Sequence, residues 1–269
     1  MSTIPPEDID TQGHAGLLIG SQWSPPGDPT WVAVIAHGYG EHIGRYQWVA
    51  ERLTADGAVV YGHDHVGHGR SEGERVLIED FERVVDDLHL LVQRAHVEHP
   101  DLPLVLIGHS MGGMIAARYT QRHPESLTAT VLSGPVLGSW EPTALADLDE
   151  IPPTPIDITT LSRDPDVGRA YEADELVWHG DFTRPTLLAL RACLETITAG
   201  GRLQVPTIWL HGADDQLVPI DRSDEGWAHI APDGAPSKRY PGARHEIFNE
   251  TNREEVLDDV LAFVHEHIG

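Results

Sequence analysis

Cysteine, lysine and long apolar runs are scarce in this sequence of 269 residues. The one cysteine, Cys193, cannot form an intramolecular disulfide bond, and we expect it to be a buried thiol without a chemical role. No stretch approaches the roughly 18 consecutive apolar residues that indicate a transmembrane helix. The opening stretch, MSTIPPEDID, lacks the basic and apolar regions of a signal peptide. These absences predict a cytoplasmic protein.

Basic residues are also few, since Lys238 is the single lysine and the formal net charge is −25. A chain this acidic repels the phosphates of nucleic acid, so nucleic acid is not expected as a partner. It also repels anionic lipid surfaces, which attract basic patches. The acidic residues are scattered rather than gathered in a tail, which indicates solubility or salt tolerance.

Short apolar runs do recur, and amphipathic helical patterns follow them. The runs end in glycine, histidine, aspartate or serine, as buried parallel strands do when they deliver side chains to one sheet edge; they cover 31–38, 58–64, 104–110, 128–134 and 205–212. Residues 79–98 and 250–268 each place apolar side chains on one helical face. This alternation predicts an α/β fold with a mostly parallel central sheet flanked by helices. Ligands of such sheets bind at the carboxyl ends of the strands.

The alternation stops between residues 138 and 204. The first part of this segment is rich in proline, aspartate and threonine, and short helical patterns follow around 166–173 and 182–199. Aromatic and aliphatic residues among them argue against a disordered linker. We therefore predict a core made of 1–137 and 205–269, with a short cap inserted at 138–204 over the sheet edge.

The most specific catalytic signal is the stretch LVLIGHSMGGMIAARY, in which Ser110 stands between Gly108 and Gly112. An apolar strand before G-x-S-x-G and a helical pattern after it form the context in which this motif carries a serine nucleophile. The glycines make room for a sharp, strained turn. The helix N-terminus then directs its N–H groups at the site. We predict that Ser110 is a nucleophile; the alternative is a tight turn with a spectator serine.

A serine hydroxyl needs a base that is oriented by a carboxylate. In this motif context the acid and then the histidine follow the serine along the chain. The stretch WLHGADDQLVP offers two acids, of which the usual spacing after the glycine favours Asp215 and keeps Asp214 as an alternative. The predicted base is His245, because the other late histidines precede the acid or lie in helical patterns.

Catalysis at a serine also needs N–H donors for the oxyanion that develops on the substrate. One donor is expected from the backbone of Met111, the residue after the nucleophile. The other is expected from Tyr39 in the early loop AHGYGEH. Both are main-chain roles, so the side chains at these positions are not required for them.

The chain resembles the monoacylglycerol lipases of the α/β-hydrolase superfamily. The matching blocks run in family order from about residue 31 to 265 and read HGYGEHIGRY, DHVGHGRSEGERV, GHSMGG, LSRDPDVGRAYEADELV, HGADDQLV and GARHEIFNE. The resemblance implies an α/β-hydrolase fold with a cap, a triad of Ser110, Asp215 and His245, and an oxyanion hole at Tyr39 and Met111. It implies no cofactor and no metal.

The resemblance also implies contacts with the alcohol part of an acyl ester. Glu41 and Arg45 match polar residues at the glycerol end of the family's pocket; the alternative is an ion pair that holds the loop. Tyr171 matches a cap residue near the alcohol end; the alternative is an aromatic residue of the cap core. The start of the cap, 134–160, is shorter and more acidic than typical family lids. We therefore expect at most a transient contact of the cap with membranes or micelles.

The activity implied by the resemblance is that of a serine carboxylester hydrolase that cleaves monoacylglycerols to fatty acid and glycerol through an acyl-enzyme. The short lid keeps a second hypothesis open, a general carboxylesterase for short, soluble acyl esters. A non-catalytic binding protein of the same fold is disfavoured, because such proteins usually lose a triad member.

The stretch YGHDHVGHGRSEG first suggests a metal site, because it holds His63, Asp64, His65 and His68. Zinc needs three or four ligands that converge in tetrahedral geometry, and no second group of ligands elsewhere has suitable spacing. We therefore predict that this loop supports the catalytic edge, with Asp64, His65 and Arg70 hydrogen-bonded to neighbouring loops.

Overall fold

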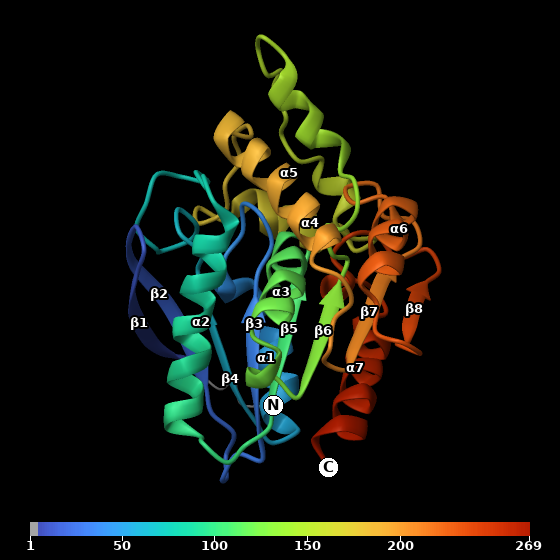
Figure 1. Cartoon of the computed structure of the whole chain (residues 1–269). Coiled ribbons are helices and arrows are strands. Elements are labelled where there is room, and N and C mark those ends of the chain that lie inside the picture. The colour runs from blue at the N-terminus through green and yellow to red at the C-terminus, as the bar shows by residue number, and fades with distance from the viewer. Residues whose placement is uncertain (1–4) are drawn as a thin grey trace.

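The computed structural model describes residues 5–269, and at its centre lies an eight-stranded sheet in the order β1-β2-β4-β3-β5-β6-β7-β8 (Figure 1). The strands are β1 (Glu7–Gly13), β2 (Gly16–Trp23), β3 (Trp31–Ala36), β4 (Ala58–His63), β5 (Leu104–His109), β6 (Ala129–Ser133), β7 (Thr207–Gly212) and β8 (Ser237–Tyr240). Strands β1, β2 and β4 pair antiparallel, and all other neighbours pair parallel. The predicted mostly parallel sheet is confirmed.

The five predicted strands are the central ones, β3 to β7, and every residue in them is buried. They read as unbroken apolar runs because helices cover both of their faces. Strands β1, β2 and β8 were not predicted, and they lie at the two ends of the sheet. The predicted strand ends do meet at one edge, since the register pairs Ala36 of β3 with Gly108 of β5 and His109 with Ser133 of β6.

Helices pack on both faces of the sheet (Figure 1). They are α1 (Gln47–Ala55), α2 (Phe81–Glu98), α3 (Met111–Arg122), α4 (Pro165–Ala173), α5 (Arg184–Ala199), α6 (Ile220–Ile230) and α7 (Arg253–Ile268). One apolar core joins the sheet to α2, α3 and α5, and the other joins it to α1 and α7. Asp80 caps the start of α2, because its carboxylate accepts the N–H of Glu82.

The segment predicted as a cap contains no strand among its described residues. Short 3₁₀ turns at Glu141–Asp147 and Ile158–Thr160 precede α4 and α5, and the segment lies above the carboxyl ends of the strands (Figure 1). Buried side chains of α5, Cys193 among them, belong to the same apolar core as α2 and α3. The second half of this segment is therefore fastened to the core, and the boundaries at 138 and 204 stay a prediction.

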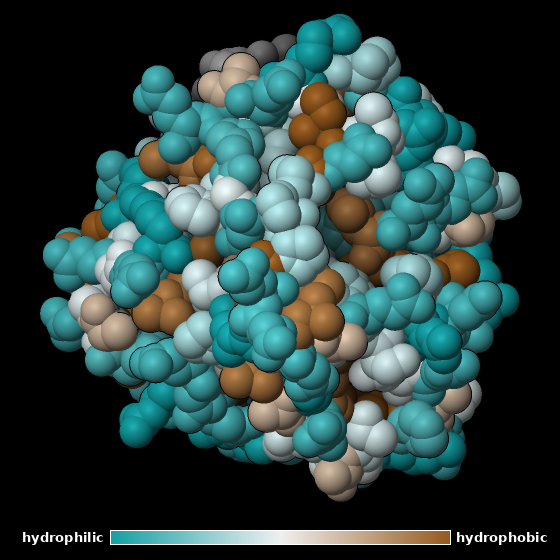
Figure 2. All heavy atoms as spheres, turned by 90° about the horizontal axis from the view of Figure 1, so that it is seen from above, coloured by the Kyte–Doolittle hydropathy of each residue, from teal (hydrophilic) through white to brown (hydrophobic). Residues whose placement is uncertain are grey.

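The surface above the strand ends is mostly hydrophilic, and its apolar side chains are scattered (Figure 2). Large apolar residues of the cap segment that reach solvent are Leu148, Leu176 and Leu188, of which Leu148 and Leu188 are 46% exposed. None of the helices within residues 5–269 combines the length and the apolar character needed to cross a bilayer.

Candidate active site

Ser110 stands at the sharp turn between β5 and α3. Its φ of +56° lies in the left-handed region, which is unusual for a residue with a side chain. The turn is fixed by the Ser110 N–H, which donates to the Ser133 carbonyl at 2.9 Å. A Cβ atom at Gly112 would collide with the carbonyl of Ala36, so only glycine fits between the turn and β3. The motif glycine thus brings α3 close to the sheet and leaves Ser110 at the strand edge.

A chain of two hydrogen bonds links the three predicted triad residues. The Ser110 hydroxyl lies 2.9 Å from Nε2 of His245, and Nδ1 of His245 lies 2.8 Å from Oδ2 of Asp215. Since a carboxylate only accepts, Nδ1 carries the proton and Nε2 is free to accept from the hydroxyl. All three residues are buried. Asp214 is exposed, and within the described chain no hydrogen bond or ion pair joins its side chain to His245.

The carboxylate of Asp215 is held by further donors. Its Oδ1 accepts the N–H groups of Leu217 and Val218, both at 2.9 Å. Nε2 of His211 lies 3.1 Å from Oδ2, a contact that sequence reasoning missed. Burial would raise the pKa of Asp215, but the charges and hydrogen bonds of His245 and His211 outweigh burial and hold the pKa well below its ordinary value. Asp215 is therefore ionised at neutral pH.

The pKa of His245 responds to the same arrangement in the opposite sense. Burial alone would lower the pKa, but the Asp215 carboxylate and the nearby Glu246 and Glu41 raise it above 6.5. The ring of His109 packs against that of His245 with centroids 4.9 Å apart, and burial lowers the pKa of His109 to about 4. His245 is thus the more basic of the two imidazoles beside Ser110.

The predicted oxyanion donors flank the nucleophile. Within the described chain, neither the N–H of Tyr39 nor that of Met111 has a hydrogen-bond partner, and both residues line the pocket that contains Ser110. Free, preorganised N–H groups beside a nucleophile are what a developing oxyanion requires.

The loop of residues 36–42, which carries Tyr39 and which we call the oxyanion loop, is fixed by a buried histidine. Nε2 of His37 accepts the N–H of His65 at 2.9 Å, so its proton sits on Nδ1, which donates to the Gly38 carbonyl at 2.8 Å. His65 in turn donates from Nε2 to the His37 carbonyl at 3.2 Å. The histidine-rich loop therefore braces the oxyanion loop.

Glu41 and Arg45 belong to a buried ion network next to Ser110. Glu41 accepts the N–H of Gly38 and the hydroxyl of Tyr46, both at 2.7 Å, and its other oxygen accepts from Arg45 at 2.7 Å. Arg45 also binds both oxygens of Glu246 at 2.8 Å. Burial would raise the pKa of Glu41, but Arg45 outweighs it and the pKa is lowered. Glu41 and Arg45 thus hold the loop, as one sequence hypothesis had it, and they also line the pocket.

Glu246 was not among the residues predicted from the sequence. Its place directly after His245 is the one signal that could have drawn attention to it. Arg45 is separated from it by 201 positions, so the pairing depends on how the loops meet in the fold.

A cavity of about 340 Å³ opens over Ser110. Every predicted site residue except Asp215 lines it. Most of its wall is apolar and comes largely from the cap segment, with Trp140, Leu145, Ile156, Leu161, Phe182 and Leu190 among the lining residues. Its charged lining is gathered around Arg45, which binds Glu41 and Glu246 and lies over the ring of Tyr171, and we call these four residues the polar end of the cavity.

Tyr171 joins the cap to the polar end. Its ring lies 4.9 Å from the guanidinium carbon of Arg45, in the range of a cation–π contact. The side chain is 3% exposed, and its buried hydroxyl has no partner within the described chain. The cap is also tied to the oxyanion loop by the Trp178 N–H, which donates to the Gly40 carbonyl at 2.7 Å, and by the pair of His42 and Asp174 at 2.9 Å.

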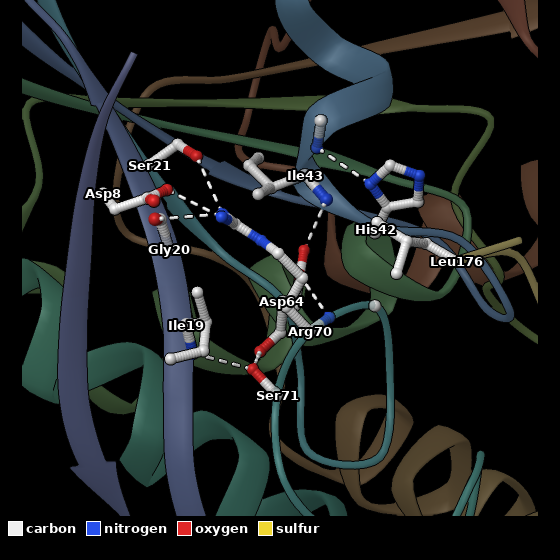
Figure 3. A network of polar contacts seen from close by, with 12 residues as sticks. Asp8, Ile19, Gly20, Ser21, His42, Ile43, Asp64, Arg70, Ser71 and Leu176 are labelled. Carbon is white, nitrogen blue, oxygen red and sulfur yellow. Dashed lines mark hydrogen bonds and ion pairs between the residues drawn. The ribbon is translucent and has the colours of Figure 1, made fainter. Parts of the chain in front are cut away.

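The stretch that first suggested a metal site forms a scaffold (Figure 3). Asp64 accepts the N–H groups of Ile43 at 2.7 Å and Arg70 at 2.8 Å, and Ser71 donates to the Asp64 carbonyl at 2.6 Å. Arg70 reaches on to Asp8 of β1 at 2.6 Å. Asp64 and His65 thus bond to neighbouring loops as predicted, whereas the Arg70 side chain bonds to strands β1 and β2 instead. Within residues 5–269, no three histidine, cysteine or acidic side chains are arranged to hold a metal ion.

The chain is similar to known hydrolases over most of its length. The family model described as serine aminopeptidase, S33, matches residues 27–252. A monoacylglycerol lipase from Mycolicibacterium smegmatis is 39% identical over 91% of this chain and 92% of its own length, and human monoglyceride lipase is 33% identical over 92% and 86%. The crystal structure of a monoacylglycerol lipase from Paleococcus ferrophilus superimposes with a TM-score of 0.81 at 26% identity, covering 93% of this chain and 99% of that one.

Proposed function

The chain belongs to the serine aminopeptidase S33 family of the α/β-hydrolase superfamily, and we propose that it is a serine carboxylester hydrolase that cleaves monoacylglycerols to fatty acid and glycerol. The observation that supports this best is the Ser110–His245–Asp215 chain at the floor of a cavity with one apolar and one polar end. The relatives named above, monoacylglycerol and monoglyceride lipases, support the substrate.

The proposed reaction starts with proton transfer from the Ser110 hydroxyl to Nε2 of His245 as the oxygen attacks the ester carbonyl. Asp215 holds the imidazole tautomer and stabilises the imidazolium. The tetrahedral oxyanion accepts from the N–H groups of Tyr39 and Met111. The C–O bond to the alcohol then breaks, and His245 returns the proton to the leaving glycerol oxygen. Water enters, gives a proton to His245 and attacks the acyl-enzyme, and the fatty acid leaves as Ser110 regains its proton.

Short, soluble acyl esters are the second candidate substrates. A cavity of about 340 Å³ lies near the lower end of the usual range for small-molecule sites, which is roughly 300–1,000 Å³. The cap face is also largely hydrophilic (Figure 2). Both features favour short acyl chains over long ones.

A chain-length series separates the two candidates. Monoacylglycerols and the corresponding ethyl esters, from butyryl to oleoyl, would be assayed by release of free acid, with Ser110→Ala as the inactive control. We expect monoacylglycerols to be preferred over ethyl esters of the same chain. Activity confined to short ethyl esters would favour the second candidate, and activity retained by Ser110→Ala would refute the serine mechanism. The cytoplasmic location and the transient lipid contact stay predictions.

A further inference from the structure

The polar end of the cavity carries a net negative charge. Glu41 and Glu246 contribute two carboxylates, and the Arg45 guanidinium between them contributes one positive charge. The three side chains are 6%, 6% and 10% exposed, so water screens them weakly. Among the described residues that line the cavity, Arg45 is the one lysine or arginine.

The positive charge of Arg45 is already paired with the carboxylates of Glu41 and Glu246. One Nη atom donates to both carboxylates and the other donates to Glu246, which is the strong, forked arrangement of a buried pair. A second anion brought to this end would find no free cation and would meet two carboxylates. Like charges placed together at a buried contact are strongly unfavourable, so the rate or affinity for an anionic ester should fall by orders of magnitude.

The polar end suits the alcohol part of a substrate, because that part carries the hydroxyl groups of glycerol. The apolar wall takes the acyl chain, and Glu41 is close to the nucleophile, since a Cβ atom on Gly38 would touch both the Glu41 carboxylate and Cβ of Ser110. The hydroxyl of Tyr171 at the same end is buried and has no partner among residues 5–269, so it can donate to or accept from an alcohol hydroxyl.

We propose that Glu246, together with Glu41, makes the enzyme select against esters whose alcohol part is anionic, so that neutral glycerol esters are cleaved and phosphorylated ones are rejected. The proposal rests on the esterase function above. Glu246 acts as the specificity-determining residue, because Glu41 also fixes the oxyanion loop, whereas the Glu246 side chain is bound, among the described residues, by Arg45 and Asn249 alone.

The test compares three octanoyl esters that differ at the alcohol. They are 1-octanoylglycerol, its 3-phosphate, and the dimethyl triester of that phosphate, which is larger but neutral. We expect kcat/KM for the triester to be within about tenfold of that for octanoylglycerol, and kcat/KM for the phosphate to be at least 100-fold below the triester. Assays in 1 M NaCl, where the Debye length is about 3 Å, remove repulsion by the acidic surface but not by the buried network.

Two substitutions that each remove one negative charge then show which residue causes the rejection of the phosphate. Glu246→Gln should lower the ratio of kcat/KM for the triester to kcat/KM for the phosphate about tenfold. The matched control is Asp157→Asn, which removes the charge of an exposed acid at the cavity rim and should change this ratio less than twofold. Glu246→Asp keeps the charge and should keep the ratio. Triester turnover and the melting temperature show whether each variant is folded.

Cleavage of the phosphate and the triester at rates equal to that of octanoylglycerol by the wild-type enzyme would overturn the proposal. Rejection of the triester as strongly as the phosphate would also overturn it, because the enzyme would then select by size rather than by charge. Equal effects of Glu246→Gln and Asp157→Asn would also overturn it. If octanoylglycerol is not cleaved at all, the proposed substrate fails instead, and the same three alcohols can be compared as butyryl esters.

Discussion

At the scale of single residues, the adjacent acids Asp214 and Asp215 differ in every respect that matters for catalysis. Asp215 is 7% exposed and bonded to His245, whereas Asp214 faces solvent. The Asp214 backbone N–H donates to the Ala243 carbonyl, and the Asp215 carboxylate accepts the N–H groups of Leu217 and Val218, which hold it toward His245.

Replacing these two acids should therefore give opposite results. Asp215→Asn should lower kcat by roughly 10⁴-fold, because the amide favours the wrong tautomer of His245. Asp214→Asn removes the same charge one position away and should keep kcat within about twofold. Initial rates on a soluble octanoyl ester measure both. Comparable losses in the two variants would contradict the assignment of Asp215.

The raised pKa of His245 sets the acid limb of the pH profile. His245 has to be neutral to take the serine proton, so kcat/KM should be full above its pKa and fall as the pH drops through it. The midpoint should lie above 6.5, the ordinary value for histidine. The measurement uses a neutral ester, with samples returned to pH 8 to verify that acid has not inactivated the protein. A midpoint below 6 would mean that the carboxylates do not act on His245 as described.

At the scale of elements, the sequence patterns predicted the strands that are buried on both faces of the sheet and missed the strands that are partly exposed. Strands β3 to β7 form continuous apolar runs and were predicted. Strand β1 is largely exposed, and β8 is the four-residue stretch Ser237–Tyr240 with three residues that reach solvent. Edge strands of this kind carry too few apolar residues to produce a recognisable period.

The same distinction explains which residues of the candidate site could be predicted from the sequence. Ser110, Asp215 and His245 stand in local motifs with fixed spacing, and the structure brings them together. Glu246 and His211 act through contacts that depend on side-chain direction in the folded loops. Composition and spacing carry no information about that direction.

His63, at the end of β4, should lower the stability of the folded protein in acid. Both ring nitrogens of His63 are buried without a partner within the described chain, and burial lowers its pKa to about 4. The unfolded state, with a pKa near 6.5, then binds more protons between these values, so stability is lost as the pH falls from 6.5 to 4. The loss from this residue is about 3 kcal/mol.

His63→Leu removes this titration. Between pH 6.5 and pH 4 the variant should lose about 3 kcal/mol less free energy of unfolding than the wild-type protein. Urea unfolding at the two pH values measures the difference. His229→Gln, a change at an exposed histidine of α6, is the control and should follow the wild type. An unchanged pH dependence in His63→Leu would show that His63 does not resist protonation in the folded state.

At the scale of the whole molecule, the acidic composition acts on stability. The chain has 43 acidic and 18 basic residues, and the described ion pairs leave many acids on the surface without a partner. Self-repulsion of this kind destabilises the compact state and is weakened by salt. The buried pairs at the active site are screened much less, so stability should respond to salt more than the chemical step does.

The melting temperature should therefore rise by several degrees between 10 mM and 1 M NaCl, as the Debye length falls from about 30 Å to about 3 Å. A variant in which three exposed acids without an ion pair in the described part of the chain are neutralised (Asp28→Asn, Asp101→Asn and Glu172→Gln) separates screening from a general salt effect. It should start from a higher melting temperature in 10 mM NaCl and gain less on addition of salt, because less repulsion remains to be screened. Equal gains in the two proteins would show that the rise comes from bulk effects of the salt, and a flat wild-type profile would show that the surface charges do not oppose folding.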